Sequence, residues 1–246
     1  LLVVWAFFFF NQRNRPEDVG LPALEEPESL AGAEVDGKLG WTRAVVVNVA
    51  LVGAFYFFLK FIRYALWSWA PFLLERNFGM SGTDAGYLST VFDVSGVVGV
   101  VATGFLSDKV FGSRRAGVSL LMVLLMTFGC LVMYGWGGTS PAFFAVCLGL
   151  VGFALYGPDA LMSGAGAMDI GSRRGAVLAA GIINGMGSLG SVIQELVIGR
   201  LYDKNGGALG PIFVLLWGAA GMAAPVFFLA TWAWASSLAT WILSTL

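Results

Sequence analysis

Long apolar segments separated by short polar ones make up most of the chain. After a first short apolar run and a polar stretch, six long segments follow, at roughly 43–72, 85–106, 116–136, 141–163, 176–200 and 211–239. As a helix, each can cross about 30 Å of hydrocarbon at about 1.5 Å per residue. The apolar positions run on without the alternation of a β-barrel strand. The pattern predicts an all-α integral membrane protein with six complete membrane helices in residues 43–246.

The first ten residues, LLVVWAFFFF, are apolar, but crossing a membrane takes about 20. They lack the basic start and the small residues of a signal peptide. We therefore expect residues 1–10 to be the end of a membrane helix that begins upstream, which would make the chain a fragment. Residues 11–42 contain three prolines, four glycines and seven acidic residues, a composition that predicts an extended linker without a core of its own.

The composition agrees with a membrane protein and excludes several functions. Hydrophobic residues make up 58% of the chain, and its mean hydropathy is +0.81. The net charge is −1 and there is no histidine, so the sequence offers no basic surface for nucleic acid and no imidazole for a metal or for proton transfer. We expect no metal and no cofactor. Cys130 and Cys147 lie in apolar segments and are expected to be reduced core thiols.

The basic residues predict which way the chain faces. The polar linker carries several of them and is therefore expected in the cytoplasm. Alternation of the helices then puts nine basic residues on the cytoplasmic side and three on the other, with Lys60 and Arg63 left inside the membrane. The C-terminus is expected in the cytoplasm, on the same side as the linker.

Lys60 and Arg63 lie within the first complete membrane helix, in the stretch LKFIRYALWSWAP. Each opposes insertion by about 2.5–3.5 kcal/mol, so their presence needs a compensating interaction. Residues three apart share a helix face, so the two cations form one stripe. Counting at about 1.5 Å per residue from the predicted helix ends places Arg63, Asp93 and Asp159 close to the midplane of the membrane.

Two interpretations of these charges remain open. One is a structural ion pair of Arg63 with Asp93 or Asp159. The other is an anion site, in which Lys60 and Arg63 bind the substrate and the two carboxylates balance them when the site is empty. A planar guanidinium can donate two parallel hydrogen bonds to a phosphate or carboxylate, whereas an ammonium acts as a point charge, so one of each suits a divalent oxyanion. Glu195 falls near the outer end of its helix, where a solvated carboxylate is the simpler expectation.

Small residues are dense in three segments, SGVVGVVATG, SGAGAMDIG and AAGIINGMGSLGS. In a membrane, small residues let helix backbones approach closely, so tight packing is the first expectation. The alternative is that glycines in 181–190 let a helix bend during a conformational cycle.

Four segments resemble a known family of transporters. The loop GFLSDKVFGSRR resembles the short-loop signature of the major facilitator superfamily, Gly-x-x-x-Asp followed by a basic, glycine-containing turn, with one residue more than the commonest form. RNRPEDVGLP, FIRYALWSWAPFLL and YGPDALMSGAGAMDIGSRRGA are similar to the organophosphate:phosphate antiporter branch of glycerol-phosphate and hexose-phosphate transporters and sugar-phosphate exchangers. The resemblance implies the C-terminal half of a twelve-helix transporter, with the end of helix 6 at 1–10, an inter-half linker at 11–42 and the six-helix C-terminal bundle at 43–246.

The resemblance also implies roles for individual residues. Arg63 matches the arginine of the second half that contacts the substrate phosphate, and Tyr156 matches a tyrosine near the same cavity. Asp93 falls where the glycerol-phosphate transporter has a glutamate, and Lys60 falls where it has an aromatic residue. Asn184 is expected at a cavity-facing position of the eleventh helix.

The loop motif implies a gate on the cytoplasmic side. Its carboxylate and basic side chains would latch one conformation and release it in another. The motif residues are Gly104, Asp108, Lys109, Arg114 and Arg115. The simpler alternative is an ordinary positive-inside loop.

The function implied is a secondary active transporter of the bacterial inner (plasma) membrane, and not an enzyme. It would exchange an organic phosphate for inorganic phosphate by alternating access, and the missing N-terminal half would supply a second arginine. Its partners would be a small phosphorylated anion, inorganic phosphate and the lipid bilayer, with no nucleic acid. Two alternatives stay open. One is the same fold acting as an ion symporter or drug exporter, with a proton on Asp159, and the other is a membrane sensor that binds sugar phosphate without transport.

Overall fold

The computed structural model describes residues 2–12, 19–20, 41–111, 115–161 and 175–245, with the backbone alone at 115 and 234–245. The chain divides into two units, Leu1–Lys38 and Leu39–Leu246. The described part of the first unit contains the helix α1 (Leu2–Asn11), whose large apolar side chains are exposed. The side chain of Asn11 donates to the carbonyl of Phe7 (2.7 Å) and so closes the last turn of this helix.

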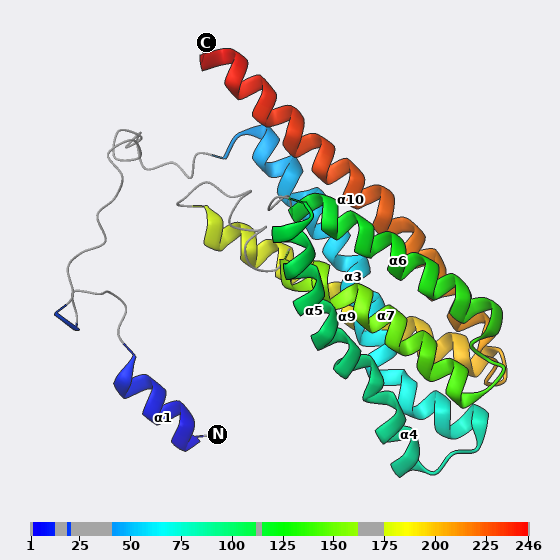
Figure 1. The fold of residues 1–246 in the computed structure, drawn as a ribbon. Helices are drawn as coiled ribbons and strands as arrows, with labels where there is room; N and C mark the ends of the chain where they lie inside the picture. The colour runs from blue at the N-terminus through cyan, green and yellow to red at the C-terminus, as the bar shows by residue number, and fades with distance from the viewer. Residues whose placement is uncertain (1, 13–18, 21–40, 112–114, 162–174, 246) are drawn as a thin grey trace. The chain divides into compact units, whose positions relative to one another are not determined.

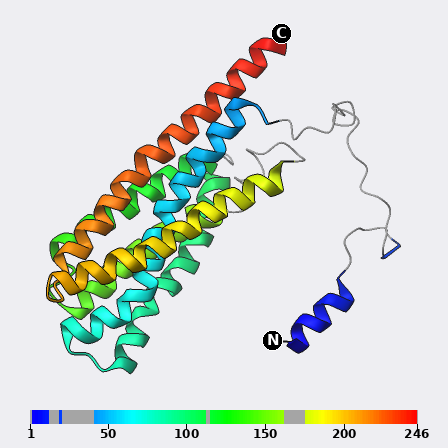
Figure 2. The ribbon, with the colours of Figure 1, turned by 180° about the vertical axis from the view of Figure 1, so that it is seen from behind.

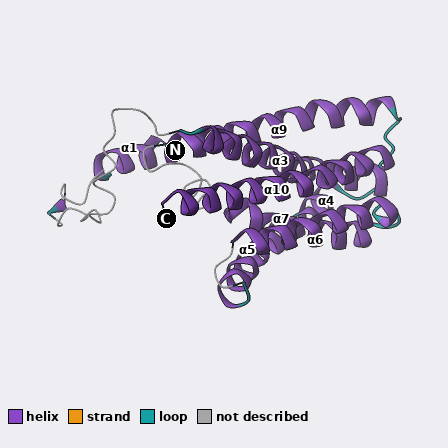
Figure 3. Ribbon diagram, turned by 90° about the horizontal axis from the view of Figure 1, so that it is seen from above, coloured by secondary structure: helices purple, strands orange, loops and turns teal. Residues whose placement is uncertain are grey.

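Helices make up the described part of the second unit, and no strand occurs among these residues (Figure 1 and Figure 3). They are α3 (Arg43–Phe78), α4 (Gly82–Ser89), α5 (Val91–Lys109), α6 (Arg115–Trp136), α7 (Pro141–Leu161), α9 (Ala176–Lys204) and α10 (Gly210–Thr245). Six spans are long and apolar enough to cross a membrane, and α4 and α5 together form one of them. The predicted fold class, an all-α membrane protein with six spanning helices, is therefore confirmed.

Helix α3 is longer than the apolar pattern predicts. It begins after Thr42, whose hydroxyl accepts a hydrogen bond from the amide of Val45 (3.4 Å). It continues past Pro71, close to the predicted end, and stops at Gly79. Gly79 has a φ of 66°, the left-handed conformation that glycine readily adopts at helix ends. Arg63 therefore lies near the middle of a helix of 36 residues.

The second span is interrupted. The sequence predicts one helix over 85–106, whereas the structure divides it at Thr90 into α4 and α5. The hydroxyls of Ser89 and Thr90 both donate to carbonyls three residues earlier, each at 2.7 Å, and such bonds compete with the regular helical ladder. Asp93 lies in the first turn of α5, within the 28-residue span Gly82–Lys109 that α4 and α5 form together.

Within the second unit, α3 packs along α9 and α10, and α7 packs along α5 and α6. Helix α10 also packs on α6. Figure 2 shows α9 and α10 meeting at one end of this bundle and diverging toward the other. The core is apolar, and its largest buried aromatic side chains are Phe55, Phe92, Phe144, Phe213 and Phe227. Cys130 and Cys147 are buried free thiols, as predicted.

Glycines let neighbouring helices approach closely. A side chain at Gly99 of α5 would collide with the backbone carbonyl of Phe153 in α7, and one at Gly152 of α7 would collide with the carbonyl of Phe92 in α5. Gly190 of α9 lies against the backbone of α3 in the same way. These contacts confirm the tight packing predicted for SGVVGVVATG and for part of AAGIINGMGSLGS. The segment SGAGAMDIG lies outside the described residues.

Candidate functional site

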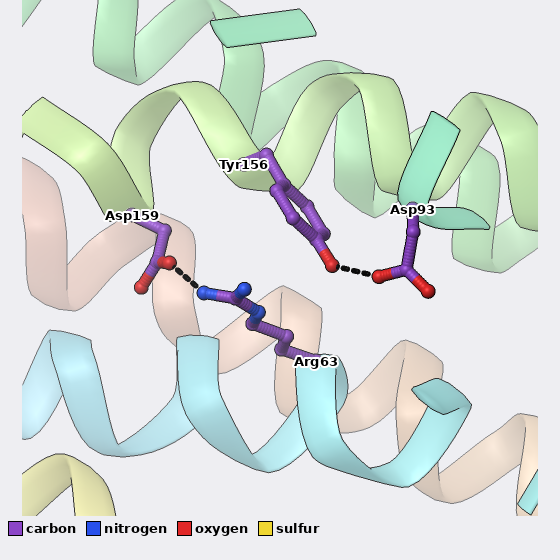
Figure 4. Close-up of polar contacts among 4 residues, drawn as sticks. All are labelled: Arg63, Asp93, Tyr156 and Asp159. Atoms are coloured by element: carbon purple, nitrogen blue, oxygen red, sulfur yellow. Dashed lines mark hydrogen bonds and ion pairs between the residues drawn. The ribbon is translucent and has the colours of Figure 1, made fainter. Parts of the chain in front are cut away.

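Three helices bring four polar residues together inside the bundle: Arg63, Asp93, Tyr156 and Asp159 (Figure 4). Nη1 of Arg63, on α3, pairs with Oδ2 of Asp159, on α7. Of the two ion pairs that the sequence leaves open, this is the one that the structure contains. The arginine side chain is 30% exposed and the aspartate side chain 10%, so the pair is largely buried while part of the cation stays accessible.

Tyr156 lies between Arg63 and Asp93. The centroid of its ring is 4.2 Å from Cζ of the guanidinium, which is a cation–π contact. Its hydroxyl donates to Oδ1 of Asp93, at the start of α5. The order in space is therefore a carboxylate, a guanidinium, an aromatic ring and a second carboxylate, and Asp93 connects to Arg63 through the tyrosine (Figure 4).

Where α5 packs closely on α7, a glycine of α5 leaves room for this tyrosine. A Cβ at Gly96 would lie 2.6 Å from ring carbons of Tyr156, so the absence of a side chain at Gly96 lets the ring occupy this position. Phe92 packs edge-on against the ring, with centroids 5.5 Å apart. The dense small residues of α5 indicated close packing, and the family resemblance indicated Tyr156, but the sequence did not indicate that this ring packs on Gly96.

The ion pair is a single contact. Asp159 is buried, and its Oδ1 has no hydrogen-bond partner among the described atoms. A two-bond pair with the guanidinium would have used that oxygen, and leaving it buried without a partner is unfavourable. The guanidinium is thus held by one carboxylate oxygen and one ring face, an arrangement in which another oxyanion can replace the carboxylate.

Lys60 lies one turn of α3 away from Arg63. Its Nζ is 4.9 Å from the ring centroid of Tyr56 on the same helix. Its stem passes Gly187 of α9, where a Cβ would lie 2.9 Å from Cδ of the lysine. The residue is half-buried, and it forms no ion pair with any carboxylate in the described part of the chain. It is therefore the more available of the two intramembrane cations.

Asn184 lies on α9 and makes local hydrogen bonds. Its side-chain Nδ2 donates to the backbone carbonyl of Ala180 one turn earlier (3.1 Å), and its backbone carbonyl accepts from the hydroxyl of Ser188 (2.9 Å). The residue is half-buried. These contacts do not join it to Arg63, and its position on a cavity wall stays a prediction.

The residues of the loop motif lie at the end of α5 and beyond it. Gly104 is half-buried within α5, and Asp108 and Lys109 are exposed at its end. Arg114 lies outside the described residues, and Arg115 begins α6. The gate that the resemblance implies stays a prediction.

A second polar contact, absent from the sequence-based expectations, joins α3 to α9. Glu195 is exposed, as expected, but its carboxylate accepts hydrogen bonds from the hydroxyl of Ser68 (2.5 Å) and the indole of Trp69 (2.9 Å). Trp69, Phe72 and Tyr202 form an aromatic cluster beside it, with ring centroids 5.2 to 6.4 Å apart. The sequence signal that could have indicated this contact is the hydroxyl of Ser68 and the indole N–H of Trp69 in the WSW stretch, since polar donors in a membrane helix need acceptors.

Comparison with known proteins identifies the family. Residues 1–194 match the family profile described as Major Facilitator Superfamily. The chain belongs to this superfamily. It is 32% identical to sugar phosphate exchanger 3 of Homo sapiens over 233 residues, a match that covers 80% of this chain and 47% of the relative. It is 28% identical to the glycerol-3-phosphate transporter of Bacillus subtilis (strain 168) over 209 residues, covering 79% and 47% of the two chains.

A third relative is the membrane sensor protein UhpC of Escherichia coli (strain K12), 26% identical over 214 residues, with 82% of this chain and 48% of the relative covered. Together these matches confirm the resemblance to the organophosphate:phosphate antiporter branch. The chain spans about half the length of the curated relatives it matches. Its six spans agree with the predicted six-helix half of a transporter of this superfamily.

Proposed function

We propose that the full-length protein is a secondary active transporter that exchanges an organic phosphate, such as a glycerol or sugar phosphate, for inorganic phosphate. The observation that carries this proposal is a partly exposed arginine inside a membrane bundle, held by one carboxylate oxygen and one aromatic ring. Similarity to a sugar phosphate exchanger and a glycerol-3-phosphate transporter supports a phosphate ester as the ligand. Transport changes no covalent bond of the substrate, so the proposed protein is not an enzyme.

In the proposed mechanism, phosphate replaces Asp159 on the guanidinium of Arg63. Binding then breaks the ion pair between α3 and α7, which allows one helix to move relative to the other. A ligand drives such a change only through its different affinities for the two states, here the inward-facing and outward-facing ones. Lys60 adds a second positive charge, which favours a divalent phosphate group.

The proposal includes parts beyond the described residues. We expect a second six-helix half to complete the cavity and contribute another arginine, since the chain spans about half the length of its relatives. We place the protein in a bacterial inner membrane, with the linker and the C-terminus in the cytoplasm. The loop after α5 would then form the cytoplasmic gate, and Asn184 would line the cavity.

The test is phosphate exchange by the full-length protein in proteoliposomes. Vesicles loaded with inorganic phosphate should take up labelled phosphate and release it when a glycerol or sugar phosphate is added outside. Arg63→Ala should weaken phosphate binding about 30-fold or more, the equivalent of roughly 2 kcal/mol for a charge-assisted contact. Arg63→Lys should recover part of the affinity, because it keeps the charge but not the two-bond geometry.

Arg200→Ala, at an exposed position near the end of α9, is the matched control and should bind and exchange phosphate like the wild type. All three arginine variants are first checked for insertion and for thermal stability. If Arg63→Ala inserts normally and binds phosphate with unchanged affinity, Arg63 is structural and the proposed site is wrong.

A sensor that binds sugar phosphate without transporting it is the second candidate, favoured by the similarity to the membrane sensor protein UhpC. Binding without exchange flux in the same vesicles would support the sensor. Uptake that needs a pH gradient and no internal phosphate would instead support a symporter, with Asp159 as the residue that carries the proton.

A further inference from the structure

The position of Tyr156 links α5 to the proposed phosphate-binding arginine on α3. The tyrosine is on α7, its ring faces the guanidinium of Arg63 at 4.2 Å, and its hydroxyl donates to Asp93 (Figure 4). On the α5 side the ring packs against Phe92, with centroids 5.5 Å apart, and against Gly96, where a Cβ would lie 2.6 Å from ring carbons. One side chain therefore joins three helices.

The ring contact restricts the orientation of the guanidinium plane, which the ion pair alone does not. The pair with Asp159 uses one guanidinium nitrogen and one carboxylate oxygen, so it fixes one atom and leaves the plane of the guanidinium free to rotate about that contact. The ring face, 4.2 Å from Cζ, is a second contact on the guanidinium and limits this rotation. The plane in turn decides whether two parallel N–H groups can point at a phosphate, which is the advantage of arginine over lysine.

Asp93 in turn determines where the ring can lie. Its Oδ1 accepts the hydrogen bond from the tyrosine hydroxyl, and Asp93 lies on α5 beside Phe92 and one turn before Gly96. An acceptor at the far end of the ring, together with packing along its sides, defines one orientation. In the described residues, the tyrosine is the contact through which this carboxylate reaches the arginine.

We infer that Tyr156 and Asp93 are positioning residues for phosphate recognition: Tyr156 holds the plane of the Arg63 guanidinium, and Asp93 acts by holding Tyr156. This inference rests on the proposed function, because it takes Arg63 as the phosphate-binding residue. It assigns Asp93 a role through its hydrogen bond and not through its charge or through contact with the substrate. The effect of removing Asp93 should therefore depend on the tyrosine hydroxyl.

The experiment is a double-mutant cycle on phosphate binding to the full-length protein. Tyr156→Phe keeps the ring and removes the bond to Asp93, and it should raise the Kd for inorganic phosphate about three- to tenfold, the usual effect of one lost hydrogen bond. Asp93→Ala should raise the Kd by a similar factor. The double variant should be no worse than either single one, because both remove the same bond.

Conservative variants separate the hydrogen bond from the charge. Asp93→Asn keeps an oxygen that can accept from the hydroxyl, so it should recover part of the loss seen in Asp93→Ala. If Asp93→Ala does not fold, the cycle is run with Asp93→Asn, whose smaller loss should vanish in the Tyr156→Phe background. Tyr134→Phe removes a hydroxyl from an exposed tyrosine of α6 that stacks on Trp217, and it should leave phosphate binding unchanged.

A positioning role is distinguished from a merely structural one by whether the effect of Tyr156→Phe on the Kd requires the guanidinium of Arg63. In an Arg63→Lys background there is no plane to hold, so Tyr156→Phe should change the Kd less than twofold. Additive losses in the cycle, or an Asp93→Asn variant as weak as Asp93→Ala, would overturn the positioning role while Arg63→Ala still loses binding. If Arg63→Ala binds phosphate normally, the proposed function itself fails, and the inference fails with it.

Discussion

Among single residues, Asp159 has two opposing effects: it compensates the charge of Arg63 inside the bundle, and it occupies the guanidinium that the proposed ligand needs. Asp159→Asn removes the competing charge and keeps the shape. We expect phosphate to bind about three- to tenfold more tightly, because the Asp159 carboxylate no longer competes with it for the guanidinium. The ligand-free variant should melt at a lower temperature, because Arg63 has lost its counter-charge. Calorimetry with phosphate and thermal unfolding without it measure the two effects.

Asp203→Asn is the matched control for this variant. It removes an exposed carboxylate at the far end of α9, and it should change neither the affinity nor the melting temperature. Weaker phosphate binding in Asp159→Asn would contradict competition and would mean that the carboxylate orients the guanidinium for its ligand.

The sequence already indicated Arg63, because a guanidinium at the centre of an apolar segment is too costly to leave without a compensating interaction. It did not indicate which carboxylate compensates it. Counting along the predicted helices put Asp93 and Asp159 at similar depths, and the difference between them is that Tyr156, packed on Gly96, lies between Asp93 and Arg63. This packing depends on a contact between helices far apart in the sequence.

The helices themselves were largely predictable, because continuous apolar runs of this length have few other stable structures in a membrane. Their ends were less so. Pro71 suggested an end for α3, but the helix continues to Gly79, where a left-handed φ stops it. The break at Thr90 arises from hydroxyl groups that bond to their own helix, which apolar periodicity does not reveal.

The contribution of the α3–α9 interface to the stability of the protein can be tested directly. Gly190 faces the backbone carbonyl of Phe57, so Gly190→Ala must push the two helices apart. Overpacking of this kind costs about 1–3 kcal/mol, and we expect the melting temperature of the full-length protein to fall accordingly. Gly221→Ala on α10 adds the same methyl group where nothing lies within 4 Å. That control should be neutral or slightly stabilising, because alanine favours helix by about 1 kcal/mol over glycine.

If Gly190→Ala were as stable as Gly221→Ala, the close approach of α9 to α3 would not hold. Gly181 and Gly185 of α9 have open space where a side chain would lie, so packing on α3 does not explain them. Whether they let the helix bend stays a prediction.

For the whole molecule, the four motifs indicate the superfamily that the family profile and the curated relatives confirm. Activity is harder to predict, since the chain spans about half the length of the curated relatives it matches. The described bundle contains Arg63 and Lys60 as cations near the proposed site, and these two residues do not distinguish an exchanger from a symporter or a sensor. The orientation of the bundle, in contrast, can be tested on this chain's own residues.

Two turns mark opposite ends of the bundle. The side chain of Asn77, at the end of α3, donates to the carbonyl of Gly207 (2.8 Å), so the turn between α9 and α10 lies at the end of the bundle where α3 stops. Val110 follows the end of α5, and α5 runs back toward the end where α3 begins. By the alternation of the helices, the sequence has nine basic residues on the side of the linker and three on the other, and this predicts that the end where α3 begins faces the cytoplasm.

Single cysteines at these two ends test the orientation. Cys130 and Cys147 are free and buried, and both are first replaced by alanine so that no other thiol of these 246 residues reacts. In intact cells, a membrane-impermeant maleimide should label Asn205→Cys in the turn after α9, and it should label Val110→Cys only after the membrane is opened, because the reagent cannot cross the hydrocarbon core. Labelling of Val110→Cys from outside, with Asn205→Cys protected, would reverse the orientation. It would also move the loop motif away from the cytoplasm and exclude it as a cytoplasmic gate.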